Sequence, residues 1–247
     1  MSEPQEDSFI SHLVELRDRL LRAVVAVVVI FVCLMPWAGD IYDILAHPMM
    51  SALPEGTKMI ATGVVTPFFV PMKVTLLVAF VIALPFVLYQ AWCFIAPGLY
   101  AHEKRLGLPL VVGSTVLFLA GMAFCYFFVF GTVFKFIAQF APKSITPAPD
   151  IEQYLAFVMS MFLAFGITFE VPVIVIVLVK LGIVDVAKLK EARPYVIVGA
   201  FVIAAVVTPP DVVSQLMLAV PMCLLYELGI FLSRFVTKTR ADEVVSS

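Results

Sequence analysis

Long apolar runs alternate with short polar stretches along nearly the whole chain. A helix needs about 20 apolar residues to cross a hydrocarbon core of ~30 Å. The pattern therefore predicts an all-α membrane protein with six transmembrane helices in one polytopic membrane domain, residues 1–247. The expected spans are residues 20–38, 67–96, 106–137, 151–179, 194–208 and 212–234.

The six runs differ in length. At 1.5 Å per residue the third would be about 48 Å long, so we expect it to tilt or to project beyond the membrane. The fifth would reach only about 22 Å before Pro209 and Pro210 stop it, and the apolar part of the sixth is also short. Short fifth and sixth helices beside a long third one indicate a curved wall. The polar stretch 39–66 is predicted to be a loop, with a short surface helix from Asp40.

Composition supports this prediction. The chain is 62% apolar and 14% charged, with a mean hydropathy of +1.07, whereas soluble domains are about 45–50% apolar and ~25% charged. No soluble fold of this size buries so much apolar surface. The acidic start, residues 1–7, with no cleavage site after the first run, is not expected to be a cleavable signal. The net charge of −2 does not indicate a nucleic-acid partner.

The distribution of basic residues predicts the orientation. Cytoplasmic segments of membrane proteins are enriched in Lys and Arg. If the N-terminus is inside, twelve of the 16 basic residues fall on the inner side. The outer segments and the adjoining helix ends then hold Lys58, Lys73, Lys135 and Lys143. Six spans place both termini on the same side, so both are expected in the cytoplasm.

A carboxyl group inside the fourth apolar run is the most unusual feature. Glu170 lies ten residues before Lys180, about 15 Å from the inner end of its helix. An ionised carboxylate is costly there, so it is expected to be protonated, paired or facing a polar cavity. It is either a structural group satisfied by a neighbouring helix, with Gln215 and Thr208 as candidate partners, or the ion relay of a small-solute or proton-coupled transporter.

Other charged residues have local explanations. Glu15 and Arg19 are spaced i,i+4, which favours an ion pair within one helix. Glu103, beside two basic residues, is expected to be solvated in a loop. Asp211 follows Pro209 and Pro210 and is expected to cap the start of the sixth helix.

Signatures of catalysis are missing from the sequence. There is no phosphate-binding loop of the Walker type and no Ser/His arrangement typical of a protease. The four cysteines have no metal-ligand spacing, and we interpret them as small buried apolar residues. The sequence therefore predicts a protein that is not an enzyme and has no cofactor or metal.

Four stretches resemble the TatC family, the multispanning subunit of the twin-arginine, Sec-independent protein translocase. They are Ser-His-Leu-Val-Glu-Leu-Arg at 11–17, Phe-Ile-Ala-Pro-Gly-Leu-Tyr with His-Glu-Lys-Arg at 94–105, Phe-Gly to Phe-Glu-Val-Pro at 165–172, and Arg-Pro-Tyr through Thr-Pro-Pro-Asp to Ser-Gln at 193–215. The resemblance spans about residues 8 to 235.

The resemblance implies a function that composition cannot supply. A TatC-like protein would be the receptor core that binds twin-arginine signal peptides of folded precursors in the bacterial cytoplasmic (inner) membrane. It would assemble with the single-span proteins TatA and TatB, with other TatC copies and with membrane lipids. Export would be driven by the proton-motive force, and no nucleic acid would be involved.

The resemblance also implies roles for particular residues. Glu15 and Glu103 would face the paired arginines of the signal peptide, with Arg17 and Phe94 beside them. A guanidinium group matches a carboxylate bidentately, and each charge-assisted hydrogen bond contributes about 1.5–3 kcal/mol.

A second implied site lies in the membrane. Glu170, Thr208 and Gln215 would form a polar patch at which TatA and TatB dock. Pro48, in the first outer loop, and Asp211 would have structural roles.

Overall fold

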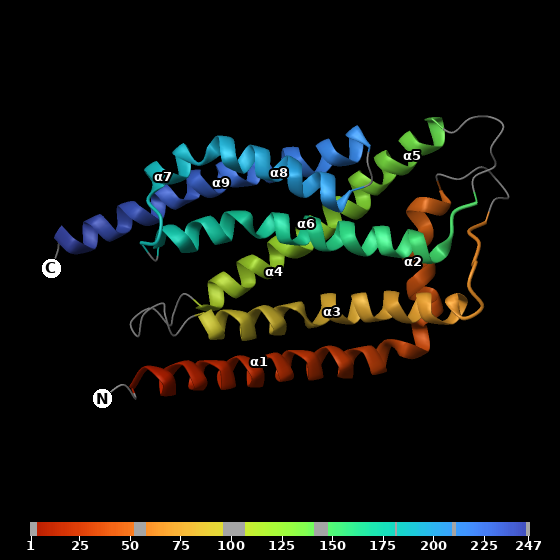
Figure 1. Ribbon diagram of the computed structural model, residues 1–247, viewed down its shortest axis with the longest axis horizontal. Coiled ribbons are helices and arrows are strands. Elements are labelled where there is room, and N and C mark those ends of the chain that lie inside the picture. Colours follow the sequence, from red (N-terminus) through yellow and green to blue (C-terminus); the bar gives the residue numbers. More distant parts are fainter. Residues whose placement is uncertain are drawn as a thin grey trace. The chain divides into compact units, whose positions relative to one another are not determined.

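The computed structural model is almost entirely helical in the part of the chain that it describes (Figure 1). It describes residues 4–51, 58–95, 107–140, 148–180, 182–208 and 211–245, with side chains defined except at 4–12, 95, 107, 140 and 235–245. Within these ranges there is no strand, only an isolated bridge between Ile60 and Asp150. The predicted all-α fold class is therefore confirmed.

The helices follow one another with short connections. In chain order they are α1 (Pro4–Leu34), η1 (Met35–Trp37), α2 (Ala38–Met50), α3 (Thr66–Ile95), α4 (Gly107–Phe124), η4 (Cys125–Val129), α5 (Phe130–Phe140), α6 (Ile151–Lys180), α7 (Val186–Glu191), α8 (Arg193–Val207) and α9 (Val212–Val245).

Six helical segments are apolar along most of their length. Five are long and apolar enough to cross a membrane, and α8, with 15 residues, is the shorter sixth. The predicted shortness thus holds for α8 but not for α9, which has 34 residues and an apolar section of 23 residues, Val212–Arg234. Pro221 lies inside α9 without ending it. The short surface helix predicted from Asp40 in the first outer loop is confirmed, because α2 occupies Ala38–Met50.

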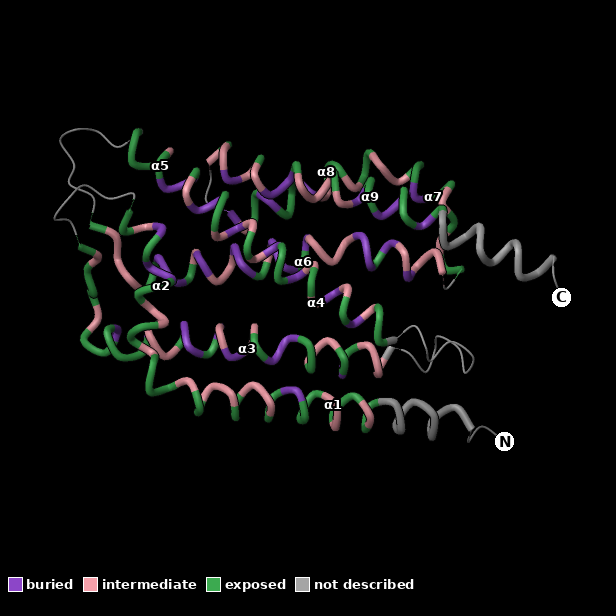
Figure 2. The backbone as a smooth tube through the Cα atoms, turned by 180° about the vertical axis from the view of Figure 1, so that it is seen from behind, coloured by how far each residue is buried: buried purple, intermediate pink, exposed green. Residues whose placement is uncertain are grey.

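Contacts divide the chain into two compact units, residues 1–44 with 68–115, and residues 45–67 with 116–247. In the first unit, α1 and α3 run side by side (Figures 1 and 2). Among the described side chains of α1 only Ala23 is buried, and Figure 2 shows the other described residues of the helix as exposed or intermediate. Rows of exposed valines and leucines would be costly in water, so lipid is the medium that this helix requires.

The second unit is built around α6. This helix packs against α9, and α8 packs against α9 in turn. Two glycines allow the α4–α6 approach: a Cβ added at Gly121 would lie 2.5 Å from the Phe165 carbonyl oxygen, and one at Gly166 would collide with the Phe118 ring. Small residues at such crossings are the usual means of close helix packing in membranes, where lipid is as apolar as the protein core.

The third apolar run contains a turn of π-helix. Between α4 and α5, residues Cys125–Val129 form a five-residue π turn whose end is marked by the Phe130 amide donating to the Cys125 carbonyl. Cys125 and Val129 are completely buried there. The cysteine prediction was wrong in part, because Cys125 is buried but Cys33 is exposed and Cys93 and Cys223 are half-buried. Apolar runs face lipid as well as protein, so an apolar setting does not imply burial in the protein.

Two polar side chains, those of Asp150 and Tyr154, fix the start of α6. The Asp150 carboxylate accepts hydrogen bonds from the amides of Glu152 and Gln153 through Oδ1, and from the amide and hydroxyl of Thr62 through Oδ2. One turn later the buried Tyr154 hydroxyl donates to the Leu45 carbonyl in α2 at 2.8 Å. Asp150 thus caps α6 and also ties it to the segment before α3.

Candidate functional site

The carboxylate of Glu15 holds an arginine of its own helix. The Nε and Nη2 atoms of Arg19 donate to Glu15 Oε1 at 2.9 and 2.6 Å, and the two side chains are 35% and 23% exposed for Glu15 and Arg19. The spacing of four residues brings them to the same face of α1. The predicted local ion pair is therefore confirmed, and it uses two donors on one edge of the guanidinium.

Arg17 lies away from this pair. Its guanidinium bonds to the neighbouring Asp18 at 2.8 Å and is two-thirds exposed. Two residues along a helix correspond to a rotation of about 200°, so Arg17 and Glu15 project on opposite sides. Phe94 is half-buried near the end of α3, and Glu103 lies outside the described residues.

Side chains of α3 line the Glu15–Arg19 pair within the first unit. The Cys93 thiol lies beside the Arg19 guanidinium, and the Tyr89 hydroxyl lies beside that thiol. Phe94 is the next residue along the chain. The structure therefore places the Glu15–Arg19 pair near the end of α3.

Glu170 is half-buried in α6, with its Oε1 atom shielded from solvent. Two residues later, Pro172 lies against Gly229 of α9, where an added Cβ would be 3.0 Å from the Pro172 Cα. The helices α6 and α9 run in the same direction (Figures 1 and 2). Gln215 precedes Gly229 by 14 residues, which places it about 18 Å from the level of Glu170 along the bundle.

Thr208 and Gln215 lie at the junction of α8 and α9. The Thr208 hydroxyl donates to the Ala204 carbonyl at 2.8 Å, and the Gln215 amide donates to the Phe201 carbonyl at 3.3 Å. Both bonds end on the backbone of α8. The predicted polar patch therefore occupies two levels of the bundle, one at Glu170 and one at this junction.

The two predicted structural residues are placed at helix positions. Asp211 accepts a 2.7 Å bond from the Ser214 amide and so caps the start of α9. Pro48 is buried inside α2, and its carbonyl accepts a bond from the Ser51 hydroxyl.

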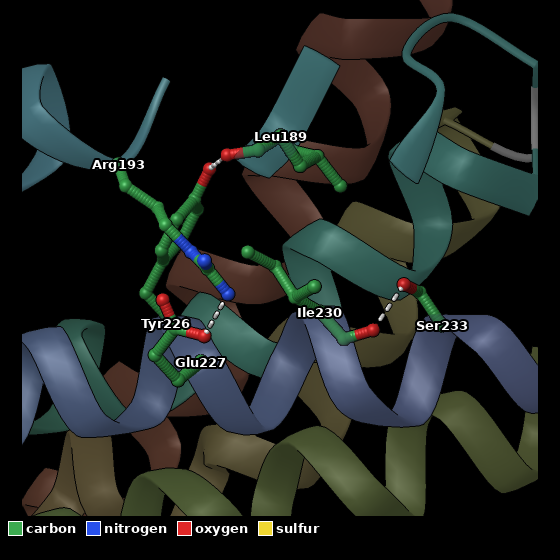
Figure 3. A network of polar contacts seen from close by, with 6 residues as sticks. All are labelled: Leu189, Arg193, Tyr226, Glu227, Ile230 and Ser233. Atoms are coloured by element: carbon green, nitrogen blue, oxygen red, sulfur yellow. Dashed lines mark hydrogen bonds and ion pairs between the residues drawn. The ribbon is translucent and has the colours of Figure 1, made fainter. Parts of the chain in front are cut away.

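A polar network at the α7–α9 corner was not anticipated (Figure 3). The buried Tyr226 hydroxyl donates to the Leu189 carbonyl at 2.8 Å, and Arg193 pairs with Glu227 at 2.7 Å. Both members of the ion pair are nearly half exposed, so it contributes less than about 1 kcal/mol. Arg193 and Glu227 are 34 residues apart, and no short-range pattern signals such a pair.

These features define a class of protein. It is a polytopic helical membrane protein with ionisable groups near the helix ends and with the carboxyl group of Glu170 inside the spanning helix α6. Among the residues that the structure describes, no cluster of three His, Cys, Asp or Glu side chains is suited to hold a metal ion.

Comparisons with known proteins identify the family. Residues 11–221 match the family model for the Sec-independent protein translocase protein TatC. The TatC of Escherichia coli K12 is 51% identical over 95% of this chain and 91% of its own length, and that of Azotobacter chroococcum mcd 1 is 54% identical over 92% and 89%. A crystal structure of the twin arginine translocase receptor TatC superposes with a TM-score of 0.80, at 40% identity, over 92% of this chain and 99% of that one. The chain belongs to the TatC family.

Family membership separates the two functions considered for this chain, a protein translocase component and a small-solute or proton-coupled transporter. It confirms the translocase prediction and gives no support to a small-solute transporter. The family is one of translocase components, so the prediction of a non-enzymatic protein is also confirmed. The protein is a multi-pass membrane protein.

Proposed function

We propose that this chain is the receptor subunit of a twin-arginine translocase and binds the signal peptides of folded precursors beside Glu15. The observation that carries the proposal is that the Glu15 carboxylate already accepts two hydrogen bonds from a guanidinium group. A site that binds one arginine in this way has the geometry to bind an arginine of a signal peptide. The solved relative described as a twin arginine translocase receptor supports the same role.

The other residues of the proposed site complete the recognition. Glu103 would bind the second arginine, and Phe94 would contact apolar residues of the signal peptide. Arg17, which is exposed and bonded to Asp18, would lie beside the peptide rather than between the acids. Two carboxylates favour Arg over Lys because only the planar guanidinium donates two parallel bonds.

A separate surface is proposed for the partners TatA and TatB. Glu170 and the Thr208–Gln215 junction would provide two docking levels for single-span helices. Glu170 is half-buried in α6, and a polar group of a partner helix would interact favourably with its carboxyl group inside the membrane. Other copies of the chain and membrane lipids would cover the remaining apolar surface, including α1. Transport would be driven by the proton-motive force.

The proposed location is the bacterial cytoplasmic membrane, with both termini in the cytoplasm. The bias of twelve basic residues to four supports this orientation. Glu15 would then lie at the cytoplasmic surface, where signal peptides arrive.

Crosslinking of a signal peptide to the purified full-length chain tests the proposal. A peptide with a photoreactive group beside its Arg-Arg pair is expected to crosslink, and its Lys-Lys counterpart is expected to crosslink at least tenfold less. Glu15→Gln and Glu103→Gln should each lower Arg-Arg crosslinking by about tenfold or more, which corresponds to one charge-assisted bond. Asp40→Asn, which removes an exposed acid of α2, is the control. Normal crosslinking in both glutamate variants would show that the assigned binding site is wrong.

A further inference from the structure

The partner of Glu15 in the structure is chemically the same as its proposed ligand. Arg19 donates from Nε and Nη2, the two positions that an arginine uses in a side-on bidentate contact. Both bonds end on one carboxylate oxygen, Oε1. An incoming guanidinium therefore meets a carboxylate that is already engaged by a guanidinium.

We infer that Arg19 is an intramolecular competitor that occupies the Glu15 carboxylate until a signal-peptide arginine displaces it. This inference rests on the proposed function of Glu15. It assigns Arg19 a role in setting the affinity of the receptor, in addition to the local ion pair that its spacing predicts.

The surroundings of Arg19 favour this role. Among the described side chains of α1, the only acids are Glu15 and Asp18, and Asp18 is bonded to Arg17. The Cys93 thiol of α3 lies beside Arg19, and the Tyr89 hydroxyl lies beside that thiol. A displaced Arg19 therefore has polar neighbours that can receive it, but no free acid among the described side chains of α1 that holds it more strongly than Glu15.

The exchange is close to balanced in energy. Displacement breaks two guanidinium–carboxylate bonds within the receptor and forms equivalent bonds to the ligand. The net cost to the ligand is the strength of the internal pair, which for an i,i+4 pair at a helix surface corresponds to about two- to fivefold in affinity. Competition by Arg19 lowers the affinity of Glu15 for every cation, so a cation that binds weakly does not displace Arg19.

Titration of labelled signal peptide into the full-length chain in nanodiscs tests the inference. Arg19→Gln is expected to raise the affinity for the Arg-Arg peptide about two- to fivefold, because Glu15 no longer has an internal partner. Arg19→Lys should give a smaller gain, since the ammonium group still neutralises Glu15 but cannot form the side-on contact. Arg22→Gln removes one positive charge from an exposed position of the same helix and measures the purely electrostatic gain.

A double-mutant cycle separates competition from other effects. In a Glu15→Gln background, Arg19→Gln should change the affinity no more than Arg22→Gln does, because the carboxylate for which Arg19 competes is missing. If Glu15→Gln alone leaves peptide binding unchanged, the proposed function is wrong. A second set of results overturns the inference itself while Glu15→Gln still weakens binding. In one, Arg19→Gln also weakens peptide binding. In the other, the affinity of Arg19→Gln for the peptide equals that of Arg22→Gln.

Discussion

Helices α1 and α6 are nearly equal in length and both contain an apolar stretch long enough to cross a membrane, but they are packed in opposite ways. Helix α1 has 31 residues and one buried residue among those whose side chains are described, whereas α6 has 30 residues, of which twelve are buried. The apolar character of α1 therefore serves contact with lipid, and that of α6 serves contact with other helices. Hydropathy alone does not separate these two uses, because lipid and protein core are equally apolar.

The composition of the two helices shows how they differ. The spanning part of α1 is rich in valine, whose branched side chains make a smooth surface. Helix α6 instead places Gly166 and the aromatic rings of Phe162 and Phe165 at its contacts, where rings of α4 and α5 meet it. Large and small residues in alternation create a surface that fits only one neighbour. Substitutions in α6 should thus affect stability, while those in α1 should affect only binding.

The largest effect is expected from Gly121→Ala at the α4–α6 crossing. The new methyl group would meet the Phe165 carbonyl oxygen, which is backbone and cannot rotate away, so the helices must separate. We expect a loss of about 3 kcal/mol, the upper part of the range for overpacking. Thermal unfolding in detergent measures it. Gly131→Ala in α5, where nothing lies within 4 Å of the added Cβ, is the control and should be neutral or slightly stabilising. Equal melting temperatures would contradict the close crossing.

A matched pair of leucine truncations compares the two helices directly. Leu155→Ala in α6 removes a side chain that is 2% exposed, and Leu21→Ala in α1 removes one that is 55% exposed. Leu155→Ala should lower the unfolding free energy by about 2 kcal/mol, the low end for leucine truncation. The cavity left by the leucine is destabilising, but the transfer of a leucine from lipid to the protein interior contributes little, because both are apolar. Leu21→Ala should cost almost nothing. Similar losses in unfolding free energy would mean that α1 is packed against protein.

Loss of one hydroxyl should weaken the start of α6. Tyr154→Phe removes the bond to the Leu45 carbonyl and is expected to cost about 1 kcal/mol. Tyr195→Phe changes a highly exposed tyrosine of α8 and should have no measurable effect. The melting temperatures of both variants in the same detergent provide the comparison.

The smallest effect is expected from Asp150→Asn, and it should depend on pH. The hydrogen bond from the Thr62 hydroxyl, followed by the amide bonds, lowers the pKa of Asp150 below its ordinary value of 3.8. A carboxyl whose pKa is lowered by folding stabilises the fold at pH values above the ordinary pKa and loses that contribution as the pH falls toward the folded pKa. The wild type should therefore melt slightly above the variant at pH 7, and the difference should shrink near pH 3. A difference that is constant with pH would show that the charge of Asp150 is not involved.

Much of the fold was predictable because it depends on local pattern. Apolar runs of spanning length predicted the helices, and a spacing of four residues predicted the Glu15–Arg19 pair. The apolar section of α9, Val212–Arg234, was predicted, but the continuation of the helix to Val245 was not, because the apolar pattern ends at Arg234.

The contacts that fix the helices against one another were not predictable either. The Tyr154–Leu45 bond joins residues 109 positions apart, and Arg193–Glu227 joins residues 34 apart. A single sequence contains no periodicity that pairs such residues. The same limit explains why Glu170 and Gln215 were grouped together, although they lie at different levels of the bundle.

The π turn at Cys125–Val129 has a consequence for how insertions and deletions act on this chain. A π turn holds one residue more than the α-helical turn it replaces, so everything after it is rotated by about 100° relative to an uninterrupted helix. Phe130 and Val133, both fully buried, owe their inward direction to that rotation. Deleting a single residue between 125 and 129 would make the helix regular but turn these side chains toward lipid. The number of residues in the π turn, rather than any one side chain, therefore determines which face of α5 points toward the protein.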